Sequence, residues 1–379
     1  MKLEQFKFTK LAGWDPKLQS KLGDVAQVVF VFGATSALKS YDYLHDLEST
    51  FPHALLVGCS TAGEICDTRV LDDSLVATAV HFEHTRIRLV HANVSRFADS
   101  ERVGEHLAKS LPQDDLVHTL VFSDGLKING SELVRGLTQH LPENVTVTGG
   151  LSADGERFRE TLVLAGGPPA AGEIALLGFY GKRLQVGYGS LGGWDVFGPV
   201  RQITRSTGNV LYDMDGKSAL ETYKKYLGDY AKDLPASALL FPLSLLNEEG
   251  ETGVVRTILS VNEQDQSMTF AGDVPLGAYG RFMKANFDRL IDGAQQAART
   301  SNSALGKSSP DLAILISCVG RKMVLKGRIE EEVEGVRKVL GKRAVLTGFY
   351  SYGEISPFTP SARCELHNQT MTITTFSEK

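Results

Sequence analysis

The chain alternates between short apolar runs and stretches in which apolar residues recur every three or four positions. Residues 27–32 form an almost wholly apolar run, which predicts a buried strand. Segment 36–51 carries apolar residues near helical spacing, and residues 54–57 form a second apolar run. This succession of strand, helix and strand predicts one βαβ module.

The same succession recurs twice, with right-handed crossovers expected in each module. The second module is expected to have a strand at 117–122, a helix at 133–141 and a strand at 144–148. The third is expected to have a strand at 312–316, a helix at 329–340 and a strand at 344–347. The chain therefore repeats one supersecondary unit.

Each module ends in a short motif, G-x-x-x-x-G-E. Its copies are Gly58–Glu64, Gly150–Glu156 and Gly348–Glu354. Partly alternating runs follow the first two copies, at 75–80 with 87–90 and at 174–180 with 184–188, and we expect them to form antiparallel hairpins. At least one strand, within 364–376, follows the third. The predicted fold is α/β, with repeated βαβ modules, antiparallel hairpins and mixed sheets.

The 379 residues exceed what one domain usually holds, so two packed domains are expected. A glycine-rich stretch at 187–199 is the expected division. The first domain, 1–195, would hold two modules. The second, 196–379, would hold the third module with inserted strands and helices.

Composition excludes several classes of function. A net charge of −5 without a basic stripe argues against nucleic acid as a partner. No apolar run approaches the length of about 18 residues needed to span a bilayer. The first residues lack the apolar core of a secretion signal, so a cytoplasmic location is expected.

Several segments resemble the FIST family. Gly58-Cys-Ser-Thr-Ala-Gly-Glu-Ile65 is similar to the hallmark of the FIST N domain, and segments 193–200, 204–223, 348–357 and 366–370 are similar to the FIST C domain. The resemblance spans about residues 26–375. It implies an intracellular bacterial sensor for small ligands. Stand-alone FIST proteins of similar layout include haem-dependent nitric-oxide sensors that act on histidine kinases, so the resemblance leaves haem open.

The motifs also suggest where a ligand would bind. Turns at the carboxyl ends of parallel strands are the usual ligand sites of α/β sheets, and glycines let the backbone approach a bound group closely. If the two domains pack pseudo-symmetrically, the first and third turns would face one cleft. The candidate ligand-binding residues there are Cys59, Ser60, Thr61, Glu64, Tyr350, Ser351, Tyr352 and Glu354. A small polar molecule such as an amino acid would suit them.

The motif glutamates have a second interpretation. Glu64, Glu156 and Glu354 occur in every copy, and a residue that every repeat requires is usually architectural. They could accept hydrogen bonds from turn amides rather than from a ligand.

Two charged loops follow the first strands of modules two and three, and we expect them to share a rim with the turns. One carries Lys127 and Asn129 after Asp124, and the other carries Arg321. The Arg321 guanidinium could pair with a ligand carboxylate or with a motif glutamate such as Glu354. Both alternatives stay open.

A haem would need an axial side chain, most often histidine. There is no C-x-x-C-H sequence, so any haem would be held non-covalently. His367 is the first candidate because it lies in the FIST-like segment near the third motif, but a hydrogen-bonded structural histidine is the simpler interpretation.

The sequence favours a sensor without catalytic activity. Its small ligand, an amino acid or similar molecule, would bind in a cleft between the domains and change contact with a separate protein such as a histidine kinase. The alternatives are a haem protein that senses nitric oxide and regulates a histidine kinase, and an enzyme that uses Cys59 as nucleophile. No histidine–acid pair is placed beside Cys59 by the sequence.

Overall fold

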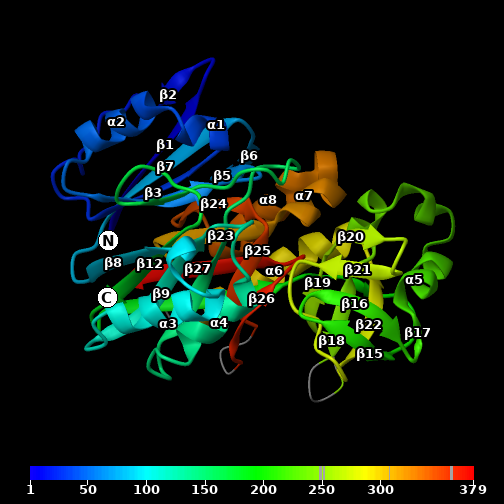
Figure 1. Ribbon diagram of the computed structural model, residues 1–379. Coiled ribbons are helices and arrows are strands. Elements are labelled where there is room, and N and C mark those ends of the chain that lie inside the picture. The colour runs from blue at the N-terminus through cyan, green and yellow to red at the C-terminus, as the bar shows by residue number, and fades with distance from the viewer. Residues whose placement is uncertain (247–249, 251, 307, 359–361) are drawn as a thin grey trace.

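A computed structural model shows three interlocked sheets on one side and a fourth sheet on the other (Figure 1). It describes residues 1–246, 250, 252–306, 308–358 and 362–379, without the side chains of residues 41 and 252. The mixed α/β class and the mixed sheets expected from the sequence are confirmed.

Three six-stranded sheets share the order of five strands, and the sixth strand lies at one edge of the first sheet and at the opposite edge of the other two. The first is β11 (Val163–Ala165), β4 (Leu55–Ser60), β3 (Val28–Gly33), β7 (Ser74–His81), β1 (Lys2–Thr9) and β2 (Gly13–Asp15). The second is β26 (Cys364–His367), β25 (Gly353–Pro357), β10 (Thr146–Leu151), β9 (Leu116–Ser123), β12 (Glu173–Tyr180) and β8 (Arg86–Asn93). The third is β6 (Arg69–Leu71), β5 (Glu64–Cys66), β24 (Val345–Ser351), β23 (Leu312–Cys318), β27 (Met371–Glu378) and β13 (Leu184–Leu191).

One pair of strands in each sheet is parallel, which confirms the three βαβ modules. These pairs are β3 with β4, β9 with β10, and β23 with β24. Each first strand also pairs antiparallel with a later strand of its own module: β7, β12 or β27.

The strand after each motif turn leaves its own module. β5 follows the first motif and pairs with β24 of the third sheet. β25 follows the third motif and pairs with β10 of the second sheet, while β11 follows the second motif and pairs with β4 of the first. This cyclic exchange interlocks the three sheets. Strands from both halves of the chain therefore share sheets, and a domain boundary at 195/196 stays a prediction.

The expected hairpins at 75–90 and 174–188 do not form. β7 belongs to the first sheet and β8 to the second, while β12 belongs to the second and β13 to the third. In the first sheet β1 pairs with the antiparallel strand β7. β8 pairs in the same way with β12 of the second sheet, and β13 with β27 of the third. β8 is therefore the first strand of module two, and β13 is the first strand of module three. Alternation of apolar and polar residues predicts a strand with one polar face, but it does not predict which other strand pairs with it. Hairpins occur instead directly after two motif turns, as β5–β6 and β25–β26.

The inner faces of the three sheets enclose a common apolar core. Phe32, Phe122 and Phe349 come from β3, β9 and β24, one from each sheet. Their ring centroids lie 5.6 Å apart for Phe32 and Phe122, 4.9 Å for Phe32 and Phe349, and 6.1 Å for Phe122 and Phe349. These edge and tilted contacts are the favoured geometries for aromatic rings.

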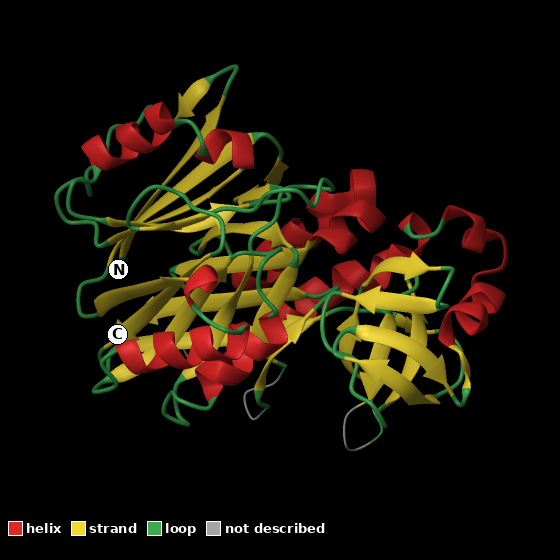
Figure 2. Ribbon diagram, in the orientation of Figure 1, coloured by secondary structure: helices red, strands yellow, loops and turns green. Residues whose placement is uncertain are grey.

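Helices cover the outer faces of the sheets (Figure 2). They are α1 (Thr35–Leu38) and α2 (Tyr41–Thr50) in module one, α3 (Ser100–Ser110) and α4 (Gly130–Thr138) in module two, and α6 (Phe287–Ala304), α7 (Val319–Leu325) and α8 (Ile329–Leu340) in module three. The single helix expected at 36–51 is two helices, because Ser40 adopts the extended backbone of an N-cap residue. No helix of the described residues is both long and apolar enough to cross a bilayer.

The fourth sheet is inserted into the third module, between β13 and α6. It has nine strands: β14 (Asp195–Val196), β15 (Arg201–Thr207), β16 (Val210–Met214), β17 (Lys217–Ser218), β18 (Leu243–Leu246), β19 (Thr252–Arg256), β20 (Ile258–Asn262), β21 (Ser267–Phe270) and β22 (Tyr279–Lys284). The helix α5 (Ala219–Leu227) packs on it and shares its separate apolar core. Short 3₁₀ turns lie at Val94–Arg96, Gly228–Asp233, Ala236–Leu240 and Lys326–Arg328.

Candidate functional site

The three motif turns meet at one end of the central core. Each turn is hydrogen bonded through its backbone to the other two. The bonds run from Ala62 N–H to the Tyr350 carbonyl (2.8 Å), from Tyr350 N–H to the Gly63 carbonyl (2.9 Å), from Ala153 N–H to the Ser60 carbonyl (2.9 Å) and from Tyr352 N–H to the Leu151 carbonyl (3.3 Å). The carboxyl ends of three parallel strand pairs thus form one connected surface.

One glycine in each turn is required by the close approach of the parallel neighbour. A Cβ would lie 1.8 Å from the Val31 carbonyl oxygen at Gly58, 1.9 Å from that of Val121 at Gly149, and 1.8 Å from that of Leu315 at Gly348. The second motif therefore begins structurally at Gly149, one residue before the Gly150 of the sequence pattern. Glu156 is exposed and does not correspond to Glu64 or Glu354.

Glu64 and Glu354 are buried beneath the turns. Glu64 accepts hydrogen bonds from the Thr61 hydroxyl and from the amide and hydroxyl of Ser74. Glu354 accepts them from the Ser351 hydroxyl (2.5 Å) and from the amide and hydroxyl of Thr370 (3.3 and 3.0 Å). Burial raises the pKa of Glu64 to about 7 and that of Glu354 to about 8, although these hydrogen bonds act in the opposite direction. The contacts favour the architectural interpretation.

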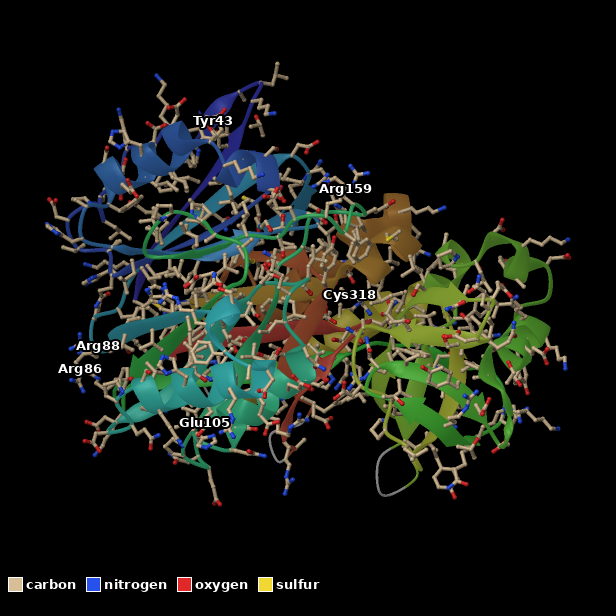
Figure 3. All side chains as sticks on the ribbon, in the orientation of Figure 1. Tyr43, Arg86, Arg88, Glu105, Arg159 and Cys318 are labelled. Carbon is tan, nitrogen blue, oxygen red and sulfur yellow. The ribbon has the colours of Figure 1, made fainter. Side chains whose placement is uncertain are left out.

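The larger cavity lies between these turns and the nine-stranded sheet. It has a volume of about 720 Å³, within the range of small-molecule sites. Its walls come from loop 125–130, from the start of α7, from the 3₁₀ turn at 236–240 and from residues 257–259 and 270–272. Cys318, labelled in Figure 3, lies on the wall that faces the nine-stranded sheet.

Tyr352 is the one predicted ligand-binding residue that lines this cavity. Its ring stacks on Phe158, with centroids 4.4 Å apart and planes 10° apart, and Phe158 also lines the cavity. The Tyr352 hydroxyl bonds to the Asp154 carboxylate and to the Gly155 carbonyl.

The longer second turn forms a rim loop over the cavity. The Asp154 carboxylate accepts the amides of Phe158, Arg159 and Glu160, and so fixes this loop (Figure 3 labels Arg159). Burial acts to raise the pKa of Asp154, but the hydrogen bonds from Tyr352 and these amides outweigh it and lower the pKa. Asp154 thus holds Phe158 against Tyr352.

A smaller cavity of about 420 Å³ lies beside helix α7, which also lines the larger cavity. Val319 and Met323 of α7 line both cavities. Its polar lining includes Lys322, which donates to the Ala62 carbonyl (2.8 Å) and pairs with Asp72. Helix α7 is therefore a shared wall.

Arg321 is fully buried and does not line either cavity. Its guanidinium pairs with Glu332 of α8 through Nε (3.1 Å) and Nη2 (2.7 Å), and it also donates to the carbonyls of Gly192 and Leu290 (2.8 Å). Tyr350 donates its hydroxyl to the same Glu332 (2.7 Å). The structure thus pairs Arg321 with Glu332 rather than with Glu354.

The remaining candidates of the first and third turns are also buried and line neither cavity: Cys59, Ser60, Thr61, Tyr350 and Ser351. Ser60 accepts the Leu162 amide (2.9 Å). Cys59 lies in the central core, where burial raises its pKa well above the usual value, so it is a protonated thiol at neutral pH. A direct contact between these residues and a ligand stays a prediction.

His367 is fully buried. Its Nε2 donates to the Ser356 carbonyl (2.7 Å), and the Phe358 ring packs 4.9 Å from its centroid. Burial lowers its pKa to about 4. No histidine of the described residues lines either cavity, and His, Cys, Asp and Glu side chains do not gather in threes as a metal site within the described part of the chain. His367 therefore does not face either cavity as an axial haem ligand, and its Nε2 is already bonded.

Sequence reasoning found one wall of the cavity and missed the other. It placed Lys127 and Asn129 on a rim with the turns, and both line the cavity with Tyr352. It missed Phe158 and the walls from the inserted sheet, such as Thr257 and Phe270. No local motif marks these residues, because the cavity forms only when the inserted sheet packs against module two.

Comparisons with known proteins cover nearly the whole chain. The family model of the FIST N domain matches residues 27–217, and that of the FIST C domain matches residues 219–357. An uncharacterized protein of Methanocaldococcus jannaschii is 21% identical over 383 residues, covering 89% of this chain and 71% of that protein. A crystal structure of cyanuric acid hydrolase from A. caulinodans aligns over 100% of this chain and 99% of that one, with 7% identity and a TM-score of 0.42, which is too low to support an inference.

Proposed function

Because the chain belongs to the FIST family, whose domains are small-ligand sensors, we propose that it senses a small molecule bound in the 720 Å³ cavity between the motif turns and the nine-stranded sheet. The single observation that carries this proposal is that the cavity joins the motif turn of module three, through Tyr352, to the inserted sheet. A ligand there would contact two separately folded cores at once, and interfaces of this kind are preferred sites for small molecules.

Signalling would proceed through α7 to a separate protein such as a histidine kinase. α7 lines the cavity with Val319 and Met323, and Arg321 between them is tied to α8 through Glu332 and to α6 through the Leu290 carbonyl. A ligand that binds more tightly to one position of α7 than to another increases the population of the first position. The size of this shift is limited by the difference between the two binding free energies. The partner protein would bind differently to the surface that the movement of α7 changes.

The two alternative functions lack a supporting contact. The haem sensor requires an axial ligand beside an open face, whereas His367 is enclosed and bonded to Ser356. The Cys59 enzyme requires an accessible thiolate, whereas Cys59 lies inside the central core with a raised pKa.

A cavity-blocking variant tests the proposal. Ala236 is exposed and lines the cavity, so Ala236→Trp would fill part of it without burying the indole in a packed core. Ala12, exposed in the β1–β2 turn, provides the matched control Ala12→Trp. The wild type and both variants are screened by thermal unfolding against small molecules of varied charge and polarity.

A true ligand at 100 times its Kd stabilises the fold by about 2.7 kcal/mol. We expect at least one compound to raise the melting temperature of the wild type and of A12W but not of A236W. If every stabilising compound acts equally on A236W, the cavity is not the site and the proposal fails.

A further inference from the structure

We propose that the ligand is an apolar monoanion, a carboxylate with a hydrophobic body, and not a zwitterionic amino acid. This inference rests on the proposed function, because it assigns a ligand class to the same cavity. It is argued from the side chains of the wall and from the charges next to it.

Most of the cavity wall is apolar. Its hydrophobic side chains come from module two, from α7 and from the inserted sheet: Leu126, Ile128, Leu151, Phe158, Leu239, Ile258, Leu259, Phe270, Val319 and Met323. Burial of apolar ligand surface against such a wall is favourable because it removes that surface from water. The body of the ligand should therefore be hydrophobic.

Lys127 is the single charged side chain among the described lining residues. It lies exposed in loop 125–130, and no ion pair joins its ammonium to a carboxylate within the described part of the chain. A cation at the rim of an apolar cavity favours an anionic group at that end of the ligand.

A second cation lies directly behind the wall. A Cβ at Gly272, a lining residue, would lie 3.0 Å from Nε and Cζ of Arg256, so this guanidinium packs against a residue of the wall. Arg256 donates to the carbonyls of Asp273 (3.0 Å) and Leu366 (2.7 Å), and no described carboxylate forms an ion pair with it. Burial lowers its pKa to about 10, so it remains a cation at neutral pH.

An amino acid would find no carboxylate to pair with its ammonium group among the described lining residues. No carboxylate lines the cavity among the described residues. Behind the wall, Asp273 accepts a hydrogen bond from Asn129 Nδ2 (3.2 Å) and acts on Arg256 electrostatically with Glu365, and Asp124 accepts the amides of Leu126 and Lys127. The charges behind the wall are thus mixed in sign, and Lys127 is the charge that faces the cavity. Because the ammonium of an amino acid is one carbon from its carboxylate, it would lie beside the Lys127 ammonium with no lining carboxylate to offset their repulsion, so the cavity discriminates against zwitterions.

Isothermal titration calorimetry with four probes tests the ligand class. Decanoate is the expected ligand, decanol and decylamine share its body without its charge, and leucine represents a zwitterion. We expect decanoate to bind the wild type more tightly than the other three. Lys127→Gln should weaken decanoate by up to about fivefold, as for an exposed ion pair, and Lys127→Glu should weaken it further because attraction is replaced by repulsion. Lys182→Glu, an exposed lysine in the β12–β13 turn, is the control with the same change of net charge.

Each outcome separates this inference from the proposed function. Equal affinity for decanoate, decanol and decylamine, or an equal effect of K127E and K182E, overturns the anionic ligand. If leucine or another class of compound stabilises the wild type but not A236W, the ligand class is wrong and the proposed function stands. If no compound of any class distinguishes the wild type from A236W, the proposed function fails. Should A236W not fold, Leu259→Trp replaces it, since Leu259 lines the cavity and is 43% exposed.

Discussion

Replacing Arg321 by methionine tests whether this residue is structural or binds ligand. Arg321 and Glu332 both have no exposed side-chain surface, and two guanidinium nitrogens hold one carboxylate oxygen at 3.1 and 2.7 Å. R321M would leave Glu332 facing only the hydroxyls of Ser317 and Tyr350. It would also remove the donors of the Gly192 and Leu290 carbonyls.

The expected loss is about 3–5 kcal/mol, the usual cost of removing one partner of a buried ion pair. Glu332→Met should cost a similar amount, because it leaves the guanidinium uncompensated. The double variant R321M/E332M removes both charges, but it leaves two carbonyls and two hydroxyls without their partners, at about 1–3 kcal/mol for each buried group left unsatisfied. The single variants together already leave the same four groups unpaired, but each also strands one buried charge, which the double variant does not. Its loss should therefore fall short of the sum of the single losses by about 0.5–3 kcal/mol.

Urea unfolding at pH 7 measures all three variants, with Arg299→Met as control. Arg299 is exposed on α6, so its replacement should change the free energy of unfolding by no more than about 0.5 kcal/mol. Additive losses, or single losses below about 1 kcal/mol, would refute the structural role. A variant R321M that is fully stable but no longer responds to ligand would instead favour the carboxylate-binding role.

Three further predictions concern the turns and the cofactor. Gly58→Ala should cost several kcal/mol in urea unfolding because its Cβ would overlap a carbonyl oxygen at 1.8 Å, whereas Gly167→Ala, with open space around it, should be nearly neutral; equal effects would contradict the turn geometry. The pKa of Glu354 is about 8 in the folded state, above the usual 4.5. Between these two pH values the folded state binds a proton that the unfolded state does not. The free energy of unfolding should therefore fall as the pH rises from 5 to 8.5. Each pKa unit corresponds to at most about 1.4 kcal/mol, and Glu354→Gln should flatten this dependence; a wild type that gains stability over this range would contradict it. Protein expressed with haem supply should show no Soret band, and a band that Ala substitution of His367 abolishes would refute our interpretation of that residue.

Periodicity and the recurring G-x-x-x-x-G-E motif predicted the repeated unit, because both are local properties of the sequence. The parallel pairs β3–β4, β9–β10 and β23–β24 lie where apolar runs indicated them. The cyclic exchange of β5, β11 and β25 was not predictable, because the side-chain pattern of a strand does not identify its neighbour. The same limit explains the hairpins that do not form.

The site was predicted in part for a related reason. A motif shows which residue types recur, but whether a side chain points into a cavity or into the core depends on register. Glu64 and Ser351 are buried beneath their turns, whereas Tyr352, adjacent to Ser351, lines the cavity. The opposite wall comes from the inserted sheet, at residues such as Phe270, and has no counterpart in the repeat.

A crystal structure of the protein grown with decanoate would test the central claim most directly, since that claim is the position of the ligand. Our account predicts electron density for the ligand between Tyr352, Met323 and Phe270, with its carboxylate toward Lys127. Ligand density at another place on the protein, with this cavity filled only by water, would contradict it.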